Sequence, residues 1–189
     1  MIIALSGPSG IGKGYIKERL LHLYPYIQEL AWFTTRSLRP NEYVGGNRTC
    51  VSVPEFNRMA DIGELVLIQN LFGHHYGLRV GDLLPTSDVK LTELHPDNVS
   101  VALKINSAII TIGFVTFELS LLHKRLAVIR NAESPAEIAK RIAAAKDEIG
   151  AILRQRSLYT SVIEVTEATE HLVLNKVLAT LTPHLQKGG

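Results

Sequence analysis

The amino-acid sequence predicts an α/β protein with a three-layer core, in which helices cover both faces of a parallel sheet, and with a small β-rich lobe. Three observations carry this prediction. A glycine-rich loop at the start of the chain lies directly between a predicted strand and a predicted helix. Predicted strands alternate with predicted helices after it, and the stretch 49–78 is rich in β-forming residues. The 189 residues fit a single domain.

The opening of the chain has the spacing of a phosphate-binding loop. The apolar run 1–5 predicts a strand, and Gly7 follows it, five positions before Gly12-Lys13. In this arrangement, backbone N–H groups surround an anion and the lysine reaches the outer phosphates of a nucleoside triphosphate. The position that usually supplies Ser or Thr to Mg²⁺ holds Gly14, so no protein ligand for a metal is expected. The expected triphosphate-binding residues are Ser9, Gly10, Ile11, Gly12, Lys13, Gly14 and Tyr15.

Patterns of β-branched and apolar residues predict the remaining strands. They lie at 27–33, 49–53, 64–70, 74–78, 99–105, within 109–117 and at 162–165. The runs 64–70 and 74–78 are close enough to form a hairpin. The run 99–105 is apolar almost throughout, which is typical of a parallel strand buried on both faces. The stretch 86–98 is instead predicted to contain turns.

Apolar residues at helical spacing predict the helices. These extend from the loop to Pro25, from 52 to about 62, before Pro85, over 122–129, from 134 to 152, and over 174–181 up to Pro183. Two of them start at capping boxes, in which a hydroxyl group and a glutamate three residues later satisfy free backbone N–H groups. The boxes are Ser52-Val53-Pro54-Glu55 and Ser134-Pro135-Ala136-Glu137.

The composition excludes several classes of protein. A net charge of +2 is too small to indicate binding to nucleic acid or to a membrane surface. The single cysteine, Cys50, excludes an internal disulfide and fits a reducing compartment. The most apolar stretch, 108–122, is too short and too polar to span a membrane, and the N-terminal apolar run is too short for a signal peptide. We therefore expect a cytoplasmic protein.

The motifs that follow the first helix resemble the guanylate kinase family. The segment Thr34–Gly45 reads T-T-R-S-L-R-P-N-E-Y-V-G, which matches the pattern T-T-R-x-x-R-x-x-E-x-x-G of that family. The run Gly73-His-His-Tyr-Gly77 follows at the spacing of its monophosphate-binding lobe, and Arg141 with Glu148 resembles the helix beside its lid. The resemblance is clear over residues 1–78 and patchy over 99–165.

The resemblance implies a P-loop kinase with a β-rich acceptor-binding lobe and a helical lid. The core would comprise 1–33, 79–125 and 142–189, the lobe 34–78, and the lid about 126–141. Such an enzyme transfers the γ-phosphoryl group of ATP, whose Mg²⁺ would be held through water, to GMP, dGMP or a related phosphorylated acceptor. The implied catalytic residues are Lys13, Arg130 and Arg141. The implied acceptor-binding residues are Thr34, Arg36, Arg39, Arg48, Glu64, Tyr76 and Asn106.

Several positions depart from the family pattern. Tyr15 is bulky where a small hydroxyl residue is usual, and Leu78 replaces a Ser or Thr that contacts guanine. In the predicted strand 101–106, Lys104 and Asn106 replace two aspartates of the family and change the local charge. We expect the binding of a phosphorylated ligand to survive these changes better than efficient phosphorylation of GMP.

Two other functions remain open from the sequence. One is a kinase with a different phosphorylated acceptor, such as ribose 1,5-bisphosphate, which the altered base contacts favour. The other is a catalytically weak binding module of the kind found in cell-junction scaffolds, against which Lys13 argues. Arg130 and Arg141 could equally be surface charges with packed stems. His74 and His75 would face opposite sides of a strand and are predicted to pack rather than to bind a metal.

Overall fold

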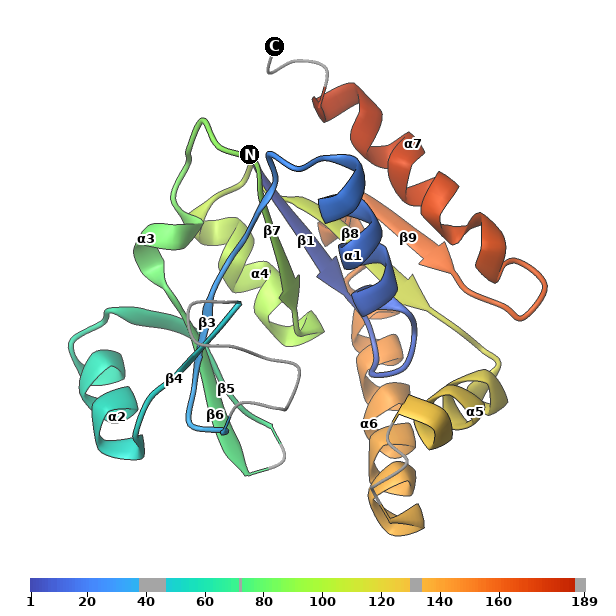
Figure 1. The fold of residues 1–189 in the computed structure, drawn as a ribbon, viewed down its shortest axis with the longest axis horizontal. Helices are drawn as coiled ribbons and strands as arrows, with labels where there is room; N and C mark the ends of the chain where they lie inside the picture. The colour runs from blue at the N-terminus through green and yellow to red at the C-terminus, as the bar shows by residue number, and fades with distance from the viewer. Residues whose placement is uncertain (38–46, 72, 130–133, 186–189) are drawn as a thin grey trace.

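A five-stranded parallel sheet forms the core of the computed structural model, which describes residues 1–37, 47–71, 73–129 and 134–185 (Figure 1). The strand order is β2-β7-β1-β8-β9. The strands are β1 (Ile2–Ser6), β2 (Gln28–Glu29), β7 (Lys90–Leu94), β8 (Ile110–Val115) and β9 (Ser161–Glu164). Every neighbouring pair in this sheet is parallel. The predicted parallel core is therefore confirmed.

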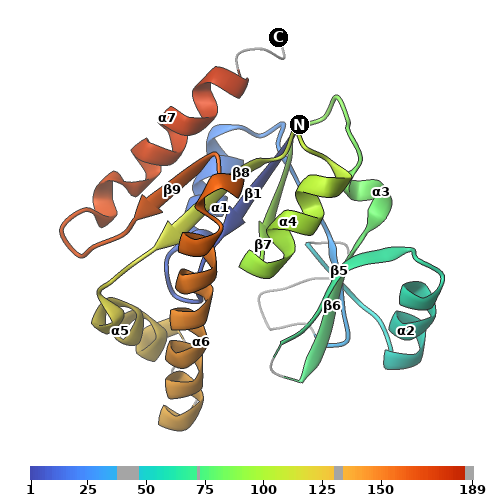
Figure 2. The same ribbon diagram turned by 180° about the vertical axis from the view of Figure 1, so that it is seen from behind.

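Helices cover both faces of this sheet, because alternate residues of the strands are apolar on each side. Ile3 and Leu5 of β1 belong to a cluster that includes residues of α1 (Lys13–Leu23) and α7 (Val173–Leu185). Ile2 and Ala4 belong to a second cluster, with residues of α4 (Pro96–Ile105) and α6 (Pro135–Arg154). Figure 1 shows α1 and α7 in front of the sheet, and Figure 2 shows α4 and α6 from the other side. The three layers predicted from the sequence are present.

A second, four-stranded sheet forms the β-rich lobe, in the order β4-β3-β6-β5. Its strands are β3 (Trp32–Thr34), β4 (Arg48–Cys50), β5 (Leu65–Leu71) and β6 (His74–Arg79), and α2 (Val53–Asp61) packs on it through Phe56 and Met59. The predicted hairpin and the Ser52 cap are confirmed, since Ser52 Oγ accepts a bond from the Glu55 N–H. The stretch predicted as one strand over 27–33 is divided between the two sheets.

The strand predicted at 99–105 is wrong, because these residues form α4. Pro96 lies in the first turn, the His95 side chain caps the helix, and the buried Val99 and Ala102 lie three residues apart, while Val101 is 41% exposed. A short apolar run fits either structure, so its periodicity could not decide. The missing strand is β7, which occupies a stretch predicted as turns.

The other helices follow the prediction closely. They are α3 (Val80–Leu83), α5 (Leu119–Ile129) and α6, which starts at a complete capping box of Ser134 and Glu137. Short 3₁₀ turns occupy Arg156–Leu158 and Glu170–Leu172. α7 continues to Leu185 instead of ending before Pro183, because a proline near the end of a helix removes little of its hydrogen bonding. Within the described residues, no helix is long and apolar enough to cross a membrane.

Candidate active site

A cavity of about 400 Å³ opens where β1 and β7 end, between the core sheet and the β-rich lobe. In open α/β sheets, ligands bind at the carboxyl ends of the strands, which is where this cavity lies. The described residues that line it are Gly7, Ser9, Lys13, Trp32, Arg36, Arg48, Gln69, Leu71, His74, Tyr76, Glu93, Leu94, His95, Arg141, Ala144 and Glu148. The cavity thus joins the loop after β1, the lobe and α6.

The loop between β1 and α1 has a conformation that requires its glycines. A Cβ atom on Gly7 would lie 2.7 Å from the carbonyl oxygen of Phe114, and Gly12 caps α1 with a φ of 112°. Arg125 of α5 supports the loop from outside, since its Nη1 donates to the Ile11 carbonyl at 2.9 Å and its Nη2 bonds to Glu170. The loop therefore presents the N-terminus of α1 to the cavity, which favours an anion.

Lys13 folds over its own loop at the mouth of the cavity. Its Nζ donates to the carbonyl oxygens of Gly7 at 2.6 Å and Pro8 at 3.2 Å, and lies 3.8 Å from Glu93 Oε2. The other oxygen of Glu93 lies 3.7 Å from Lys17 Nζ. Phosphate oxygens entering the loop can replace the two carbonyl oxygens as acceptors for Lys13.

Cationic side chains reach the cavity from three parts of the fold. Lys13 comes from the loop, Arg36 and Arg48 come from the lobe, and Arg141 comes from α6. Tyr76 of β6 lines the same cavity. Arginine binds phosphate groups through paired N–H donors, so this arrangement suits a ligand with phosphates at both ends of the cavity.

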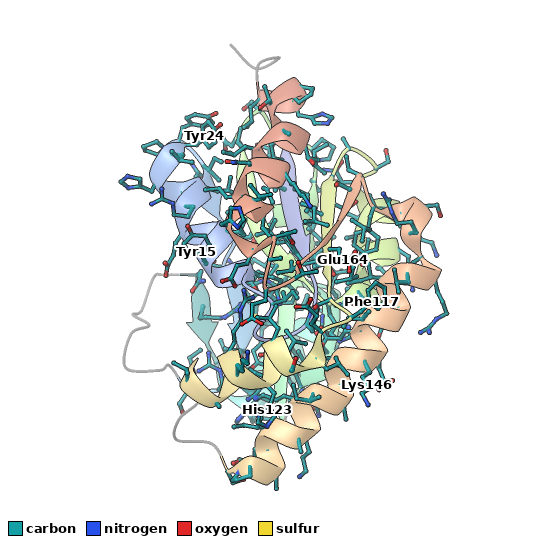
Figure 3. The ribbon with its side chains drawn as sticks, turned by 90° about the vertical axis from the view of Figure 1, so that its right-hand side faces the viewer. Tyr15, Tyr24, Phe117, His123, Lys146 and Glu164 are labelled. Carbon is teal, nitrogen blue, oxygen red and sulfur yellow. The ribbon has the colours of Figure 1, made fainter. Side chains whose placement is uncertain are left out.

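Two further residues of the predicted site, Thr34 and Tyr15, do not line the cavity. Thr34 is fully buried, and its Oγ1 accepts the N–H of Arg36 at 3.1 Å, so it holds the turn that carries Arg36. Tyr15 lies on the surface at the start of α1, with 60% of its area exposed (Figure 3). Arg39 and Arg130 are outside the described residues.

Glu64 and Asn106, which were predicted to bind the acceptor, do not line the cavity. Glu64 forms an ion pair with Arg79 at 2.9 Å, and neither residue lines the cavity. Asn106 caps the C-terminus of α4, donates its side-chain N–H to the Leu83 carbonyl, and accepts the N–H of Ala108. Both positions depended on an assumed alignment, and that of Asn106 depended on the strand that proved to be α4.

Lys104 and Leu78 also have structural explanations. Lys104 lies in the last turn of α4, not at the carboxyl end of a strand, so it does not replace an acidic group of the site. Leu78 is fully buried in the cluster that contains Leu67 and Val99. Its side chain belongs to the core.

The cavity also contains residues that were not predicted as site residues. Glu93 and His95 lie at the end of β7 and just beyond it, and they were missed together with that strand. Glu148 lies seven residues after Arg141 on α6, and this spacing places both on one face of a helix, which is a signal that the sequence did contain. Trp32, Gln69 and His74 carried no comparable signal.

Burial shifts the pKa of two ionisable groups of the cavity towards their uncharged forms. Desolvation raises the pKa of Glu148 from 4.5 to about 7, although nearby Lys13 opposes this shift. Desolvation lowers the pKa of His95, and Lys13 lowers it further, while Asp97 acts in the opposite direction. Near neutral pH Glu148 is therefore partly protonated, and it opposes the binding of an anionic ligand less than a fully ionised carboxylate would.

The acidic groups of the cavity fit a metal that arrives with its ligand. Among the described residues, no group of three or more His, Cys, Asp or Glu side chains could hold a metal ion. Mg²⁺ in phosphoryl-transfer sites usually takes one or two carboxylates, waters and substrate phosphates instead. Glu93 is the lining carboxylate within 3.8 Å of Lys13, and is thus placed to take this part.

Comparison with known proteins identifies relatives over most of the chain, although no family model matches it. A guanylate kinase of Lactobacillus acidophilus is 33% identical over 165 residues, which cover 79% of this chain and 74% of that protein. The chain belongs to the guanylate kinase family. A guanylate kinase of Streptococcus agalactiae is 30% identical over 162 residues, which cover 82% and 75% of the two chains. The resemblance inferred from the motifs is confirmed.

The fold agrees with this family assignment. The crystal structure of the guanylate kinase from Anaplasma phagocytophilum superposes with a TM-score of 0.70 and covers 97% of this chain and 85% of that one, at 20% identity. The α/β core and the second sheet are thus those of a guanylate kinase fold. At 20% identity, the superposition supports the architecture alone. The roles of single residues are therefore argued from the geometry of the cavity.

Proposed function

We propose that the protein is a nucleoside monophosphate kinase that transfers the γ-phosphoryl group of ATP to GMP, dGMP or a related phosphorylated acceptor. The observation that carries the proposal is the single cavity lined by Lys13 on one side and by Arg36, Arg48 and Tyr76 on the other. Its relatives named guanylate kinase support the choice of a purine nucleotide as the acceptor.

In this proposal, the loop holds the donor and the lobe holds the acceptor. The backbone N–H groups of the loop and Lys13 bind the β- and γ-phosphates of ATP. Arg36 and Arg48 bind the acceptor phosphate, and the Tyr76 hydroxyl donates to it. Glu93 would help to hold the Mg²⁺ that arrives with ATP, largely through water, and the metal would supply positive charge to the phosphates. Arg141, which lines the cavity from α6, supplies a further positive charge to the phosphates.

The reaction itself requires mainly positioning and positive charge. An oxygen of the acceptor phosphate attacks the γ-phosphorus, the bond to the β–γ bridging oxygen breaks, and ADP leaves with the electron pair of that bond. In this proposal, Lys13 and Arg141, which line the same cavity, stabilise the charge of the transferred group. No general base is needed when the acceptor phosphate is already ionised.

A second acceptor class is favoured by one observation. Within the described part of the lobe, no carboxylate lines the cavity, so guanine would find no acidic partner there. A sugar bisphosphate such as ribose 1,5-bisphosphate needs only the phosphate-binding groups. The aromatic side chains Trp32 and Tyr76 in the cavity argue for an acceptor with a planar base.

A panel of acceptors tests the proposal. ADP release from ATP and Mg²⁺ is measured with GMP, dGMP, AMP, CMP, UMP and ribose 1,5-bisphosphate. The proposal predicts turnover with GMP and dGMP. Turnover with ribose 1,5-bisphosphate alone would contradict the nucleotide acceptor, and ligand binding without any turnover would indicate a binding module.

A further inference from the structure

The hairpin that lines the acceptor side of the cavity contains a bulge. Val66 of β5 pairs with Leu78 of β6, but the next pair is Gln69 with Tyr76, so two residues of β5 lie opposite one of β6. Leu67, inside the bulge, has a φ of 55° and is the one residue other than glycine with a positive φ in the described chain. β-Bulges bend a strand and redirect the side chains that follow.

The bulge is held in place from the core. The Leu67 side chain is buried in the cluster with Leu78 and Val99. Its carbonyl oxygen accepts a hydrogen bond of 2.9 Å from Asn98 Nδ2, and Asn98 is itself buried on α4. A left-handed conformation is unfavourable for leucine and persists only where the surroundings determine it. The fold therefore maintains the bulge despite its cost.

The bulge determines which side chain of β5 faces the acceptor. Residues directly opposite each other in an antiparallel pair share a face, and Gln69, Leu71, His74 and Tyr76 all line the cavity. Without the extra residue, Ile68 would stand opposite Tyr76 and take the place of Gln69. Ile68 is instead 45% exposed.

Residues on the opposite face of the hairpin confirm this orientation. Asn70 pairs with His75, and the His75 ring stacks on Phe56 with ring centroids 5.5 Å apart, on the side of α2. Asn70 is exposed. The neighbouring residues Gln69 and Asn70 of β5 therefore lie on opposite faces of the hairpin. Of these two side-chain amides, Gln69 is the one that lines the cavity.

Gln69 brings a distinctive hydrogen-bonding group to the acceptor. It is the one side-chain amide among the described lining residues, and it offers both a carbonyl acceptor and N–H donors. Trp32 presents its ring, because its Nε1–H already donates to Thr92 Oγ1 at 3.0 Å. The carboxylates of the cavity, Glu93 and Glu148, come from β7 and α6 instead of the lobe.

A side-chain amide is complementary to one edge of a 6-oxopurine. Its oxygen accepts the N1–H of the base, and its N–H donates to O6 of the base. Guanine and hypoxanthine share this edge and differ only in the 2-amino group of guanine. A carboxylate would differ, because it accepts from N1–H and from the 2-amino group together and offers no donor to O6.

We propose that Gln69 is the specificity-determining residue of the acceptor site, and that it reads the N1–H and O6 edge of a 6-oxopurine monophosphate without using the 2-amino group. The protein then phosphorylates GMP and IMP with similar efficiency. This inference rests on the proposed kinase function, and it names both the acceptor class and the side chain that selects it.

The test compares kcat/KM for GMP and IMP, with ATP and Mg²⁺, in the wild-type protein, Gln69→Glu and the control Asn70→Asp. We expect the wild-type ratio of GMP to IMP to lie within about threefold of one, since no carboxylate from the described part of the lobe lines the cavity to accept a hydrogen bond from the 2-amino group. Gln69→Glu should raise the ratio about tenfold or more, because a charged acceptor gains a bond to that group. Asn70→Asp adds the same charge on the other face and should leave the ratio unchanged.

A second variant keeps the inference testable if Gln69→Glu does not fold. Gln69→Leu should lower kcat/KM for GMP and IMP by equal factors of about tenfold, with an unchanged melting temperature. A wild-type preference for GMP over IMP above about a hundredfold, an unchanged ratio in a folded Gln69→Glu protein, or full activity of Gln69→Leu would overturn the inference. Absence of turnover with every nucleotide would instead contradict the proposed kinase function.

Discussion

Lys13 and Glu148 line the same cavity, and a substitution of either residue has a measurable effect on activity or on stability. Lys13 holds the mouth of the loop through the Gly7 and Pro8 carbonyls, within 3.8 Å of Glu93. Glu148 faces the cavity from α6 and is desolvated there. The first side chain is available to phosphate oxygens, and the second lowers the cost of binding anions by remaining partly protonated.

Lys13→Ala should reduce the rate of phosphoryl transfer by about 10³-fold or more, because a positioned cation at the transferred group has effects of this size. Its melting temperature should change little, since the variant loses two hydrogen bonds to backbone carbonyl oxygens and one long ion pair with Glu93. Steady-state kinetics and a thermal melt measure both. Lys146→Ala is the control, because Lys146 is an exposed cation on α6 (Figure 3). Retained activity in Lys13→Ala would show that the loop does not hold the donor.

Glu148→Gln should change how stability depends on pH. The folded-state pKa of Glu148 is about 7, above its ordinary value of 4.5, so the folded protein holds a proton that the unfolded chain releases. Stability is therefore highest below pH 4.5 with respect to this group and falls as the pH rises towards and through 7. Between pH 5 and 8 the wild type should lose about 1 to 3 kcal/mol relative to Glu148→Gln, allowing for partial exposure. Urea unfolding at several pH values in this range measures the difference. If the free energy of unfolding depended on pH in the same way in both proteins, the raised pKa of Glu148 would be refuted.

Single residues were predictable where a motif fixes their neighbours, as in the loop around Lys13. Gln69 was not predictable in this way. Its orientation depends on the left-handed conformation of Leu67 and on a hydrogen bond from Asn98, which is 31 residues away from Leu67 in the chain. No local pattern in β5 indicates that an extra residue enters the pairing there. Long-range packing of this kind is beyond what periodicity can show.

At the scale of the elements, the start of α6 determines the position of a cationic side chain in the cavity. Its capping box begins at Ser134, and seven residues beyond Ser134 the helix places Arg141 in the cavity. Ser134 Oγ accepts the N–H of Glu137, and the Glu137 carboxylate accepts the N–H of Ser134 in return. The position of Arg141 thus depends on where this helix starts.

Ser134→Ala should lower the free energy of unfolding by about 1 kcal/mol, which is the usual effect of removing a helix cap. The rate of phosphoryl transfer should fall as well if fraying of the first turns displaces Arg141. Urea denaturation measures the first effect and steady-state kinetics the second. Ser120→Ala is the matched control, because Ser120 is an exposed serine of α5. Equal stabilities of the two variants would show that the cap contributes nothing.

The helices with capping boxes were predicted correctly because their signals are local: a hydroxyl, a proline and a glutamate at fixed spacing. The turns predicted within 90–98 and the strand predicted at 99–105 were wrong because the structure of these residues depends on contacts that are distant in the sequence. Lys90–Leu94 contains two charged residues, yet it lies next to the central strand β1 and pairs with it over its full length. The run at 99–105 is apolar because α4 packs between the core sheet and the lobe. Both outcomes follow from tertiary packing, which overrides local preference.

At the scale of the whole molecule, two sheets meet at one cavity, and each contributes one half of the proposed chemistry. The loop after β1 belongs to the core, whereas Arg36, Arg48 and Tyr76 belong to the lobe (Figures 1 and 2). Lys17 of α1 bonds to Glu29 at 2.5 Å, and Glu29 also accepts a bond from Asn47, at the start of the lobe strand β4. The order of the elements in the sheet, and not any single motif, brings the two halves together.

Arg48→Ala should therefore affect the acceptor more than the donor. We expect KM for GMP to rise about 10- to 100-fold, the equivalent of one charge-assisted interaction with phosphate, while KM for ATP changes little. Arg58→Ala is the control, since Arg58 belongs to the same lobe but is exposed and paired with Glu55 on α2. Equal effects on both substrates would show that the lobe does not hold the acceptor alone.

The most direct measurement follows the phosphoryl group itself. ATP labelled at its γ-phosphate is incubated with GMP, Mg²⁺ and the protein, and the nucleotides are separated. The structure predicts that the label appears in the β-phosphate of GDP, that Lys13→Ala and Arg48→Ala slow its appearance, and that Lys146→Ala does not. Release of the label only as inorganic phosphate, or no loss of label from ATP, would contradict the account of this cavity as a site of phosphoryl transfer.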